Sequence, residues 1–384
     1  MKQWIARLGS LVVCLSVAAA CGGDKSPSAP TPTPAASVTA PALDSPANNQ
    51  QLDTLRPTLT VRNATSDQTG TRSYEFQVSD NPAFTAANTS NIPGFAATVG
   101  KTGVVEGTGG KTSFTPDSDL QPTTLFNWRA RAVQGTATGP WSASGTFKSK
   151  LVGYNRPGEL YDPLIHGETV GTIVGSATFI PGRGLQLNQG AGFVGFVKYV
   201  LPQTISSGEF SMEVEGLRAN GPGDKAKVFG MQQGPDDSDF VTNKYRIDVQ
   251  YRGANGVPPN CIQFRVLYGS ATDTSVRYEP DTAKRNASVF LLDASTTYYW
   301  QATWGSVFRL AMLQGGIGGS TVYDYSIPTP KGSYQPSPHY AYLGAPPARS
   351  GPEAASIPGT IYRNVWLSNR PRPASLGSAI GGRF

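Results

Sequence analysis

The sequence is poor in the residues that metal centres and many catalytic sites use. It contains three cysteines and two histidines, His166 and His339, in 384 residues, too few sulfur and nitrogen ligands for a zinc cluster. Charged residues make up 15% of the chain, and the net charge of +6 is scattered without a basic run, so nucleic-acid binding is not indicated. The glycine-rich stretch 314–321 lacks the lysine of a phosphate-binding loop, and no serine stands in a nucleophile elbow.

The few cysteines also limit disulfide bonding. Cys14 lies in the N-terminal leader, residues 1–20, and Cys21 is the first residue after this leader. Cys261 is then the one cysteine in the rest of the chain. We therefore expect no intrachain disulfide, and we expect Cys261 to be a small buried apolar side chain.

The N-terminus carries a targeting signal. Lys2 and Arg7 precede an apolar run at 8–20 that is too short to span a bilayer, and small residues precede Cys21. Residues 1–20 resemble a bacterial lipoprotein signal peptide, with Ala18 where that family prefers leucine. The resemblance implies that Cys21 is acylated, with palmitate as one of its chains, and anchors the protein to a membrane of the bacterial cell envelope, outside the cytoplasm. The alternative is an ordinary cleaved signal ending in Ala-x-Ala.

Residues 21–42 are rich in Pro, Ser, Thr and Ala and nearly free of large apolar side chains. Such a segment cannot bury enough surface to fold, and its prolines favour an extended chain. At about 3.1 Å per residue it would reach roughly 60 Å, so we predict a disordered stalk that holds a folded body away from the membrane.

The rest of the chain is predicted to be all-β with many turns, because glycine and proline number 44 and 31 and aromatic residues make up 10%. A first folded unit is expected at 43–149, with alternating strands at 57–61, 74–79, 112–116, 125–133 and 144–149. Residues 120–147 resemble the last two strands of a fibronectin type III domain, matching at Leu120, Trp128 and Trp141. Phe126 replaces the usual tyrosine. The resemblance implies a sandwich that serves as a spacer or protein-binding module, with both tryptophans in packing roles.

A second unit is expected at 155–377. Its strand candidates, most with period two, are 193–201, 209–217, 225–233, 244–252, 261–269, 296–304, 307–313 and 360–369. This long run of strands favours one large jelly roll. Residues 296–316 resemble the concanavalin A-like lectin/glucanase superfamily, close to laminin-G-type domains, at Trp304, Gly305, Phe308 and Leu310. Asn364 stands where that family often has an aspartate. The resemblance implies a jelly roll that binds its ligand in the groove of a concave sheet.

Strand alternation identifies candidates for a carbohydrate-binding face. Residues that share one side of their strand are Arg246, Asp248 and Gln250, then Gln263 and Arg265, and then Tyr299 and Gln301. Planar hydrogen-bonding groups and an aromatic ring suit the hydroxyls and C–H surfaces of a sugar. We expect all seven side chains to line one curved sheet. The alternative is the solvated outer face of an ordinary sandwich.

Evidence for catalysis is weaker. Glu209, Glu213 and Glu215 lack the spacing of the paired carboxylates in glycosidases of this fold, and we expect Glu213 and Glu215 to face solvent. Alginate lyases of the same fold use a Gln-x-His strand, and residues 228–234 have no histidine. His339 has tyrosines nearby that would suit acid–base chemistry, although both histidines lie in loop-like sequence.

A calcium site is a further candidate. Asp236, Asp237 and Asp239 lie close together in the sequence and could hold Ca²⁺ through carboxylate oxygens. A plain polar turn is the alternative. No other cofactor is predicted.

We therefore predict a surface lipoprotein that presents a carbohydrate-binding or adhesion module to a polysaccharide or surface glycan. One alternative is a divergent polysaccharide lyase or glycoside hydrolase of the same fold. Another is a structural envelope protein that binds no glycan.

Overall fold

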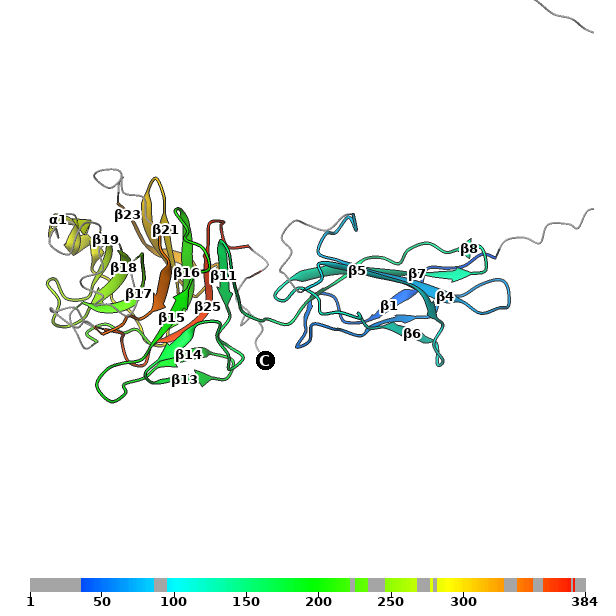
Figure 1. Cartoon of the computed structure of the whole chain (residues 1–384), viewed down its shortest axis with the longest axis horizontal. Helices are drawn as coiled ribbons and strands as arrows, with labels where there is room; N and C mark the ends of the chain where they lie inside the picture. The colour runs from blue at the N-terminus through cyan, green and yellow to red at the C-terminus, as the bar shows by residue number, and fades with distance from the viewer. Residues whose placement is uncertain are drawn as a thin grey trace, which may run out of the picture.

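A computed structural model describes residues 36–85, 95–221, 225–233, 246–267, 277–278, 282–327, 337–347, 355–373 and 376. This part of the chain is all-β, as predicted, apart from the short helical turns α1 (Thr282–Arg285) and η1 (Asn286–Ser288). The strands form two units that follow one another along the long axis of the molecule (Figure 1). Within the described ranges, no helix has the length and apolar character that a membrane crossing requires.

The first unit is a sandwich of two sheets. One sheet has the order β1 (Ala42–Ser45), β3 (Leu59–Arg62) and β6 (Lys111–Phe114). The other has the order β2 (Gln50–Gln51), β9 (Gly145–Lys148), β7 (Leu125–Gln134), β4 (Ser73–Ser79) and β5 (Thr98–Val105), with β8 (Ala137–Thr138) beside β7. All five predicted strands are present.

The period-two pattern of β7 explains how the first unit is filled. Its inward side chains are all fully buried: Phe126, Trp128, Ala130 and Ala132. Trp128 is therefore a core residue. Trp141 instead lies against two guanidinium groups, those of Arg129 and Arg131, each 4.5 Å from its ring. Both tryptophans have packing roles, one inside the core and one at the surface.

The first unit begins earlier than the sequence suggested. Val38 is buried in its core and pairs with Ser66 through an isolated bridge. The backbone N–H of Ser37 donates to the Asp67 carboxylate at 2.8 Å. Residues 36–42, which we assigned to the stalk, therefore pack on the first unit, because Val38 supplies an apolar side chain among the polar ones.

The second unit is a larger sandwich, and one of its layers is a nine-stranded sheet. The main order is β10 (Tyr154–Arg156), β11 (Glu159–Asp162), β25 (Ile361–Ser368), β16 (Gly208–Glu215), β21 (Tyr298–Trp304), β22 (Phe308–Gln314) and β23 (Ser320–Ile327). The hairpin of β13 (Ala177–Ile180) and β14 (Gly184–Leu187) joins it at β25. Adjacent strands of this sheet are antiparallel.

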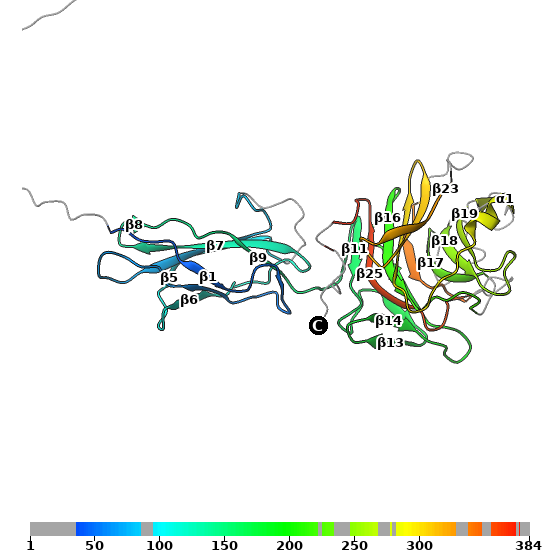
Figure 2. The same ribbon diagram turned by 180° about the vertical axis from the view of Figure 1, so that it is seen from behind.

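The opposite layer is a seven-stranded sheet. Its order is β12 (Thr172–Val174), β15 (Phe196–Val200), β24 (Tyr340–Leu343), β17 (Ala226–Gln232), β18 (Arg246–Arg252), β19 (Cys261–Leu267) and β20 (Arg277–Tyr278). The chain passes between the two layers several times, for example from β16 to β17 and from β24 to β25, as in a jelly roll. Figure 2 shows the two layers from behind.

Aromatic side chains join the two layers. Phe229 of the seven-stranded sheet meets Phe210 and Trp300 of the nine-stranded sheet edge to face, with ring centroids 5.2 and 6.3 Å apart. Because one side of each strand fills this core, the alternate side chains of both sheets point away from it. Cys261 is buried, as predicted, and its Sγ contacts the backbone carbonyl oxygens of Ile262 and Arg285.

Candidate functional site

Polar side chains gather on the side of the seven-stranded sheet that faces away from the core. Strand pairing places Tyr342, Gly230, Asp248 and Arg265 in one row across β24, β17, β18 and β19. Directly paired residues of antiparallel strands project to the same side. A second row pairs Gln232 with Arg246, and a third contains Lys227, Gln250 and Gln263. We call these eight side chains the polar face: Lys227, Gln232, Arg246, Asp248, Gln250, Gln263, Arg265 and Tyr342.

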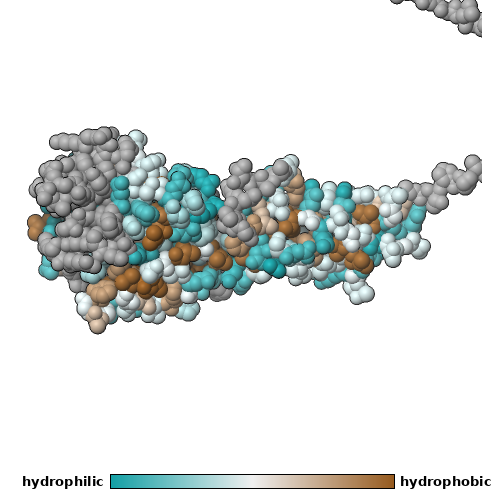
Figure 3. Space-filling model, in the orientation of Figure 1, coloured by the Kyte–Doolittle hydropathy of each residue, from teal (hydrophilic) through white to brown (hydrophobic). Residues whose placement is uncertain are grey.

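The polar face is buried. Each of its eight side chains belongs to a residue that is at most 1% exposed. In the view of Figure 3, hydrophilic residues cover much of the described surface, with hydrophobic residues in smaller groups between them. Polar residues at the surface are therefore ordinary in this protein. Charged groups that are buried as deeply as those of the polar face are rare unless they are paired or functional.

Asp248 holds the charged part of the polar face together. Arg265 donates to both of its carboxylate oxygens, from Nε and Nη2, at 2.7 Å each. Arg246 Nε lies 3.1 Å from Asp248 Oδ2. Burial alone would raise the pKa of the Asp248 carboxyl, but the charges of Arg265, Lys227 and Arg246 outweigh burial and lower it. The carboxylate is therefore ionised at neutral pH.

Amide groups continue this network. Lys227 Nζ donates to Gln250 Oε1 at 2.8 Å, and Gln250 Nε2 donates to Gln263 Oε1. Gln232 Nε2 donates to the Tyr342 hydroxyl at 2.9 Å. Two atoms of these amides are buried without a hydrogen-bond partner, the acceptor Gln232 Oε1 and the donor Gln263 Nε2. Unsatisfied buried polar atoms are costly, which makes these two candidates for contact with a ligand.

Aromatic rings border the polar face on the β24 and β15 side. The rings of Tyr342 and Phe196 lie 6.0 Å apart, and Phe193 lies 6.3 Å beyond Phe196. The His339 ring lies against that of Tyr340 in a tilted arrangement, with centroids 4.9 Å apart. Its backbone N–H donates to the Gln232 carbonyl at 3.0 Å. His339 therefore lies at the start of β24, next to the polar face, whereas His166 is exposed.

Five of the seven predicted sugar-binding residues share the polar face. They are Arg246, Asp248, Gln250, Gln263 and Arg265. The expectation that Tyr299 and Gln301 join them is wrong, because both lie on β21 in the nine-stranded sheet. The two side chains donate there to the Glu209 carboxylate, at 3.1 and 2.9 Å. Alternation shows which residues of a strand lie on the same side, but it does not show to which sheet the strand belongs.

The carboxylates of β16 also lie on the nine-stranded sheet. Glu213 is 1% exposed, so the expectation that it faces solvent is wrong. It accepts hydrogen bonds from Arg363 Nε and Asn364 Nδ2, both at 2.8 Å, and from the Ile317 N–H at 3.1 Å. Glu215 forms an ion pair with Arg183. These carboxylates fasten β25 and the β22–β23 hairpin to β16.

Sequence reasoning missed three members of the polar face, Lys227, Gln232 and Tyr342. Tyr342 lies on β24, in sequence that we interpreted as a loop. The alternation of Tyr340 and Tyr342 around the buried Ala341 was the signal that could have identified this strand. Lys227 is displaced from simple alternation by an irregularity between Lys227 and Phe229, and such bulges are difficult to predict.

Two predicted sites lie outside the residues that the structure describes. They are the lipidation site Cys21 and the calcium candidates Asp236, Asp237 and Asp239. Among the described side chains, no three His, Cys, Asp or Glu residues are grouped closely enough to hold a metal ion.

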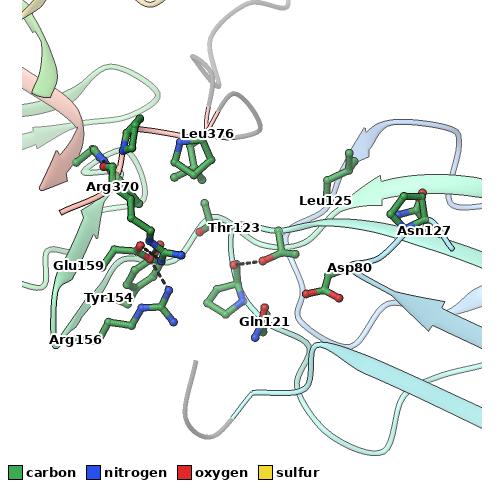
Figure 4. A pocket seen from close by; sticks show the side chains of 16 residues that line it. Asp80, Gln121, Thr123, Leu125, Asn127, Tyr154, Arg156, Glu159, Arg370 and Leu376 are labelled. Atoms are coloured by element: carbon green, nitrogen blue, oxygen red, sulfur yellow. Dashed lines mark hydrogen bonds and ion pairs between the residues drawn. The ribbon is translucent and has the colours of Figure 1, made fainter. Parts of the chain in front are cut away.

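A cleft of about 790 Å³ lies where the two units meet (Figure 4). Asp80 and Gln121 line it from the first unit, and Tyr154, Arg156 and Arg370 from the second, around the buried Glu159. The Glu159 carboxylate accepts from Tyr154 at 2.9 Å and pairs with both arginines. Since these charged groups neutralise one another, the cleft is a weaker candidate than the polar face.

Comparison with known proteins gives no family assignment. No family model matches the chain, and no curated protein matches it. Among solved structures, alginate lyase Aly36B matches with 14% identity and a TM-score of 0.34, over 56% of this chain and 98% of its own. The Ca²⁺-bound exoplasmic/lumenal domain of VIP36 matches with 10% identity and a TM-score of 0.33, over 58% and 94%. Chicken CNTN1 FN1–FN3 domains match with 10% identity and a TM-score of 0.18, over 76% and 66%. These values are too low to transfer an activity, so we infer the function from the residues of this chain.

Proposed function

We propose that this protein binds a polysaccharide or surface glycan on its polar face and is held at the bacterial cell envelope through Cys21. The observation that supports binding most directly is the pair of unsatisfied atoms, Gln232 Oε1 and Gln263 Nε2, within a buried charged network. One atom needs a donor and the other needs an acceptor. A sugar hydroxyl can act as either, and a carbohydrate carries many of them.

The neighbouring groups suit the same ligand. The guanidinium groups of Arg246 and Arg265 provide planar donors, and the rings of Tyr342 and Phe196 provide apolar surface. A network maintained only for stability would be unusual, because replacing buried ion pairs by apolar residues is often neutral or stabilising. A binding role accounts for retaining these groups at this depth.

Charge on the polar face suggests which sugars bind best. Its described side chains comprise three cations, Lys227, Arg246 and Arg265, and one carboxylate, Asp248. We therefore expect acidic polysaccharides to bind more tightly than neutral ones, and we expect added salt to weaken that binding.

Binding of the purified protein to a panel of immobilised acidic and neutral polysaccharides tests the proposal. Gln263→Ala removes an amide from the polar face, and Gln301→Ala removes the same group from the opposite sheet. We expect Gln263→Ala to weaken binding roughly tenfold and Gln301→Ala to leave it unchanged. Absence of binding to every polysaccharide, or equal effects of both variants, would overturn the proposal.

The same assay separates binding from catalysis. New reducing ends or unsaturated products from a bound polysaccharide would identify a hydrolase or a lyase. An unchanged chain length over a long incubation identifies a binding module.

A further inference from the structure

The central row of the polar face contains a position without a side chain. Gly230 stands on β17 between Tyr342 of β24 and Asp248 of β18, to which it is directly paired. It lies in the regularly paired part of β17 and is not one of the glycines with positive φ. The backbone conformation does not require glycine there, and a strand normally gains stability from a larger residue. The missing side chain therefore calls for a different explanation.

The residues around Gly230 offer complementary contacts to a small hydroxylated ring. The aromatic ring of Tyr342 stands on one side and the Asp248–Arg265 ion pair on the other. Gln232 follows two residues along the same strand, about 7 Å away, and projects to the same side. Because its Nε2 is used by Tyr342, its unsatisfied Oε1 is an acceptor that a hydroxyl near Gly230 would satisfy.

The second unsatisfied atom lies farther away. Gln263 is on β19, two strands from Gly230 and two residues along the strand direction from its row, a separation of about 12 Å. One sugar ring above Gly230 would not span both amides. Gln263 Nε2 is therefore placed to serve a neighbouring ring of the same chain, so that an oligosaccharide runs diagonally over the strands.

We propose that Gly230 forms the floor of a subsite that admits one sugar ring, and that Gln232 selects rings with a hydroxyl directed at its Oε1. This inference rests on the proposed function and assigns it a position and a specificity residue. Any side chain in place of Gly230 would project between Tyr342 and the ion pair.

The test measures oligosaccharide affinity and melting temperature for Gly230→Leu and Gly230→Ala. A matched control is Gly100→Leu on β5, an exposed strand glycine of the first unit whose added Cβ would approach only the Phe76 carbonyl, at 3.6 Å. We expect Gly230→Leu to weaken binding roughly tenfold or more, Gly230→Ala to weaken it less, and the control to bind normally.

Gln232→Leu adds a readout that does not depend on filling the subsite. We expect it to lose roughly fivefold in affinity for the hydroxylated ligand. We also expect it to discriminate less than the wild type between that ligand and its deoxy analogues. If Gly230→Leu fails to fold, Gly230→Ala and Gln232→Leu decide the question.

The outcomes also separate this inference from the function on which it rests. Normal binding by the folded Gly230→Leu variant, together with weaker binding by Gln263→Ala, would overturn the subsite and leave carbohydrate binding intact. The subsite is likewise overturned if Gln232→Leu leaves affinity and discrimination unchanged. No binding by the wild type to any polysaccharide overturns both.

Discussion

Arg265 and Asp248 form a bidentate ion pair in which both N–H···O distances are 2.7 Å and both residues are at most 1% exposed. The same unit contains a similar pair at its surface, Arg309 and Asp324, at 2.8 and 2.7 Å, with side chains 41% and 46% exposed. The two ion pairs have nearly the same N–H···O distances, but one pair is buried and the other is exposed. They therefore allow the effect of burial to be measured within one fold.

We predict that Asp248→Asn lowers the free energy of unfolding by about 3 kcal/mol, because it leaves Arg265 and Arg246 buried beside a neutral group. Asp324→Asn should cost less than about 1 kcal/mol, since solvent screens the exposed pair. Urea unfolding at neutral pH measures both values. Equal effects would show that the polar face is solvated and not enclosed.

The pH dependence of this pair has a definite sign. The pKa of Asp248 is lowered in the folded state from its ordinary 3.8. Its ionised form therefore stabilises the protein above that value, and the contribution is lost as the pH falls through the folded pKa. Asp248→Asn should be less sensitive than the wild type to acid below about pH 4.

Asp162 should make the free energy of unfolding depend on pH in the opposite direction. Its Oδ2 accepts from Thr169 Oγ1 at 2.5 Å, from Tyr199 OH at 3.0 Å and from the Val170 N–H at 3.1 Å. Burial, which outweighs these bonds, raises its pKa from 3.8 to about 6. Between those values the folded state holds the proton more tightly than the unfolded state, so stability falls as the pH rises.

We predict that this decline amounts to as much as about 3 kcal/mol between pH 4 and pH 6. Asp162→Asn should remove it, because the amide does not titrate. Unfolding measured at half-unit pH steps, for the wild type and the variant, gives the difference directly. A wild-type curve that rises as steeply as that of the variant across this window would contradict the raised pKa.

Glu213 tests whether the carboxylates of β16 are structural. It receives hydrogen bonds from Arg363, Asn364 and the Ile317 N–H. We predict that Glu213→Ala destabilises the protein by about 3 kcal/mol, because Arg363 loses its buried partner, whereas folded protein still binds carbohydrate. Glu168→Ala is the matched control, since Glu168 is exposed. Loss of binding without loss of stability in Glu213→Ala would instead place this residue in a ligand site.

The positions of the strands could largely be predicted from the sequence, because a strand that buries one face against the core alternates apolar and polar residues. Strands β16, β18 and β22 begin and end within two residues of the predicted ranges. Which sheet each strand joins depends on contacts between residues far apart in the chain. Gln263 and Gln301 show comparable alternation, yet they lie on opposite layers. Local periodicity alone could not separate them.

Burial of the polar face was equally hidden from the sequence. Arg246 and Asp248 have the composition of a solvated surface, and only the whole fold shows that they are enclosed. Tyr342 was missed for a related reason, since a four-residue strand gives a weak local signal. Candidate residues on long strands were therefore predictable, whereas the site that they form was not.

The lipid anchor remains a prediction from the N-terminal sequence, and Cys21→Ala tests it. We expect wild-type cells to incorporate labelled palmitate into this protein and to retain it in the membrane fraction, because two or three acyl chains hold a protein far more firmly than one. Cys21→Ala should lose both the label and the membrane retention. Cys14→Ala and Cys261→Ala are matched controls and should keep them, because neither cysteine follows the small residues that precede Cys21. Label that persists in Cys21→Ala would contradict acylation at this cysteine, and wild-type protein without label would favour an ordinary cleaved signal.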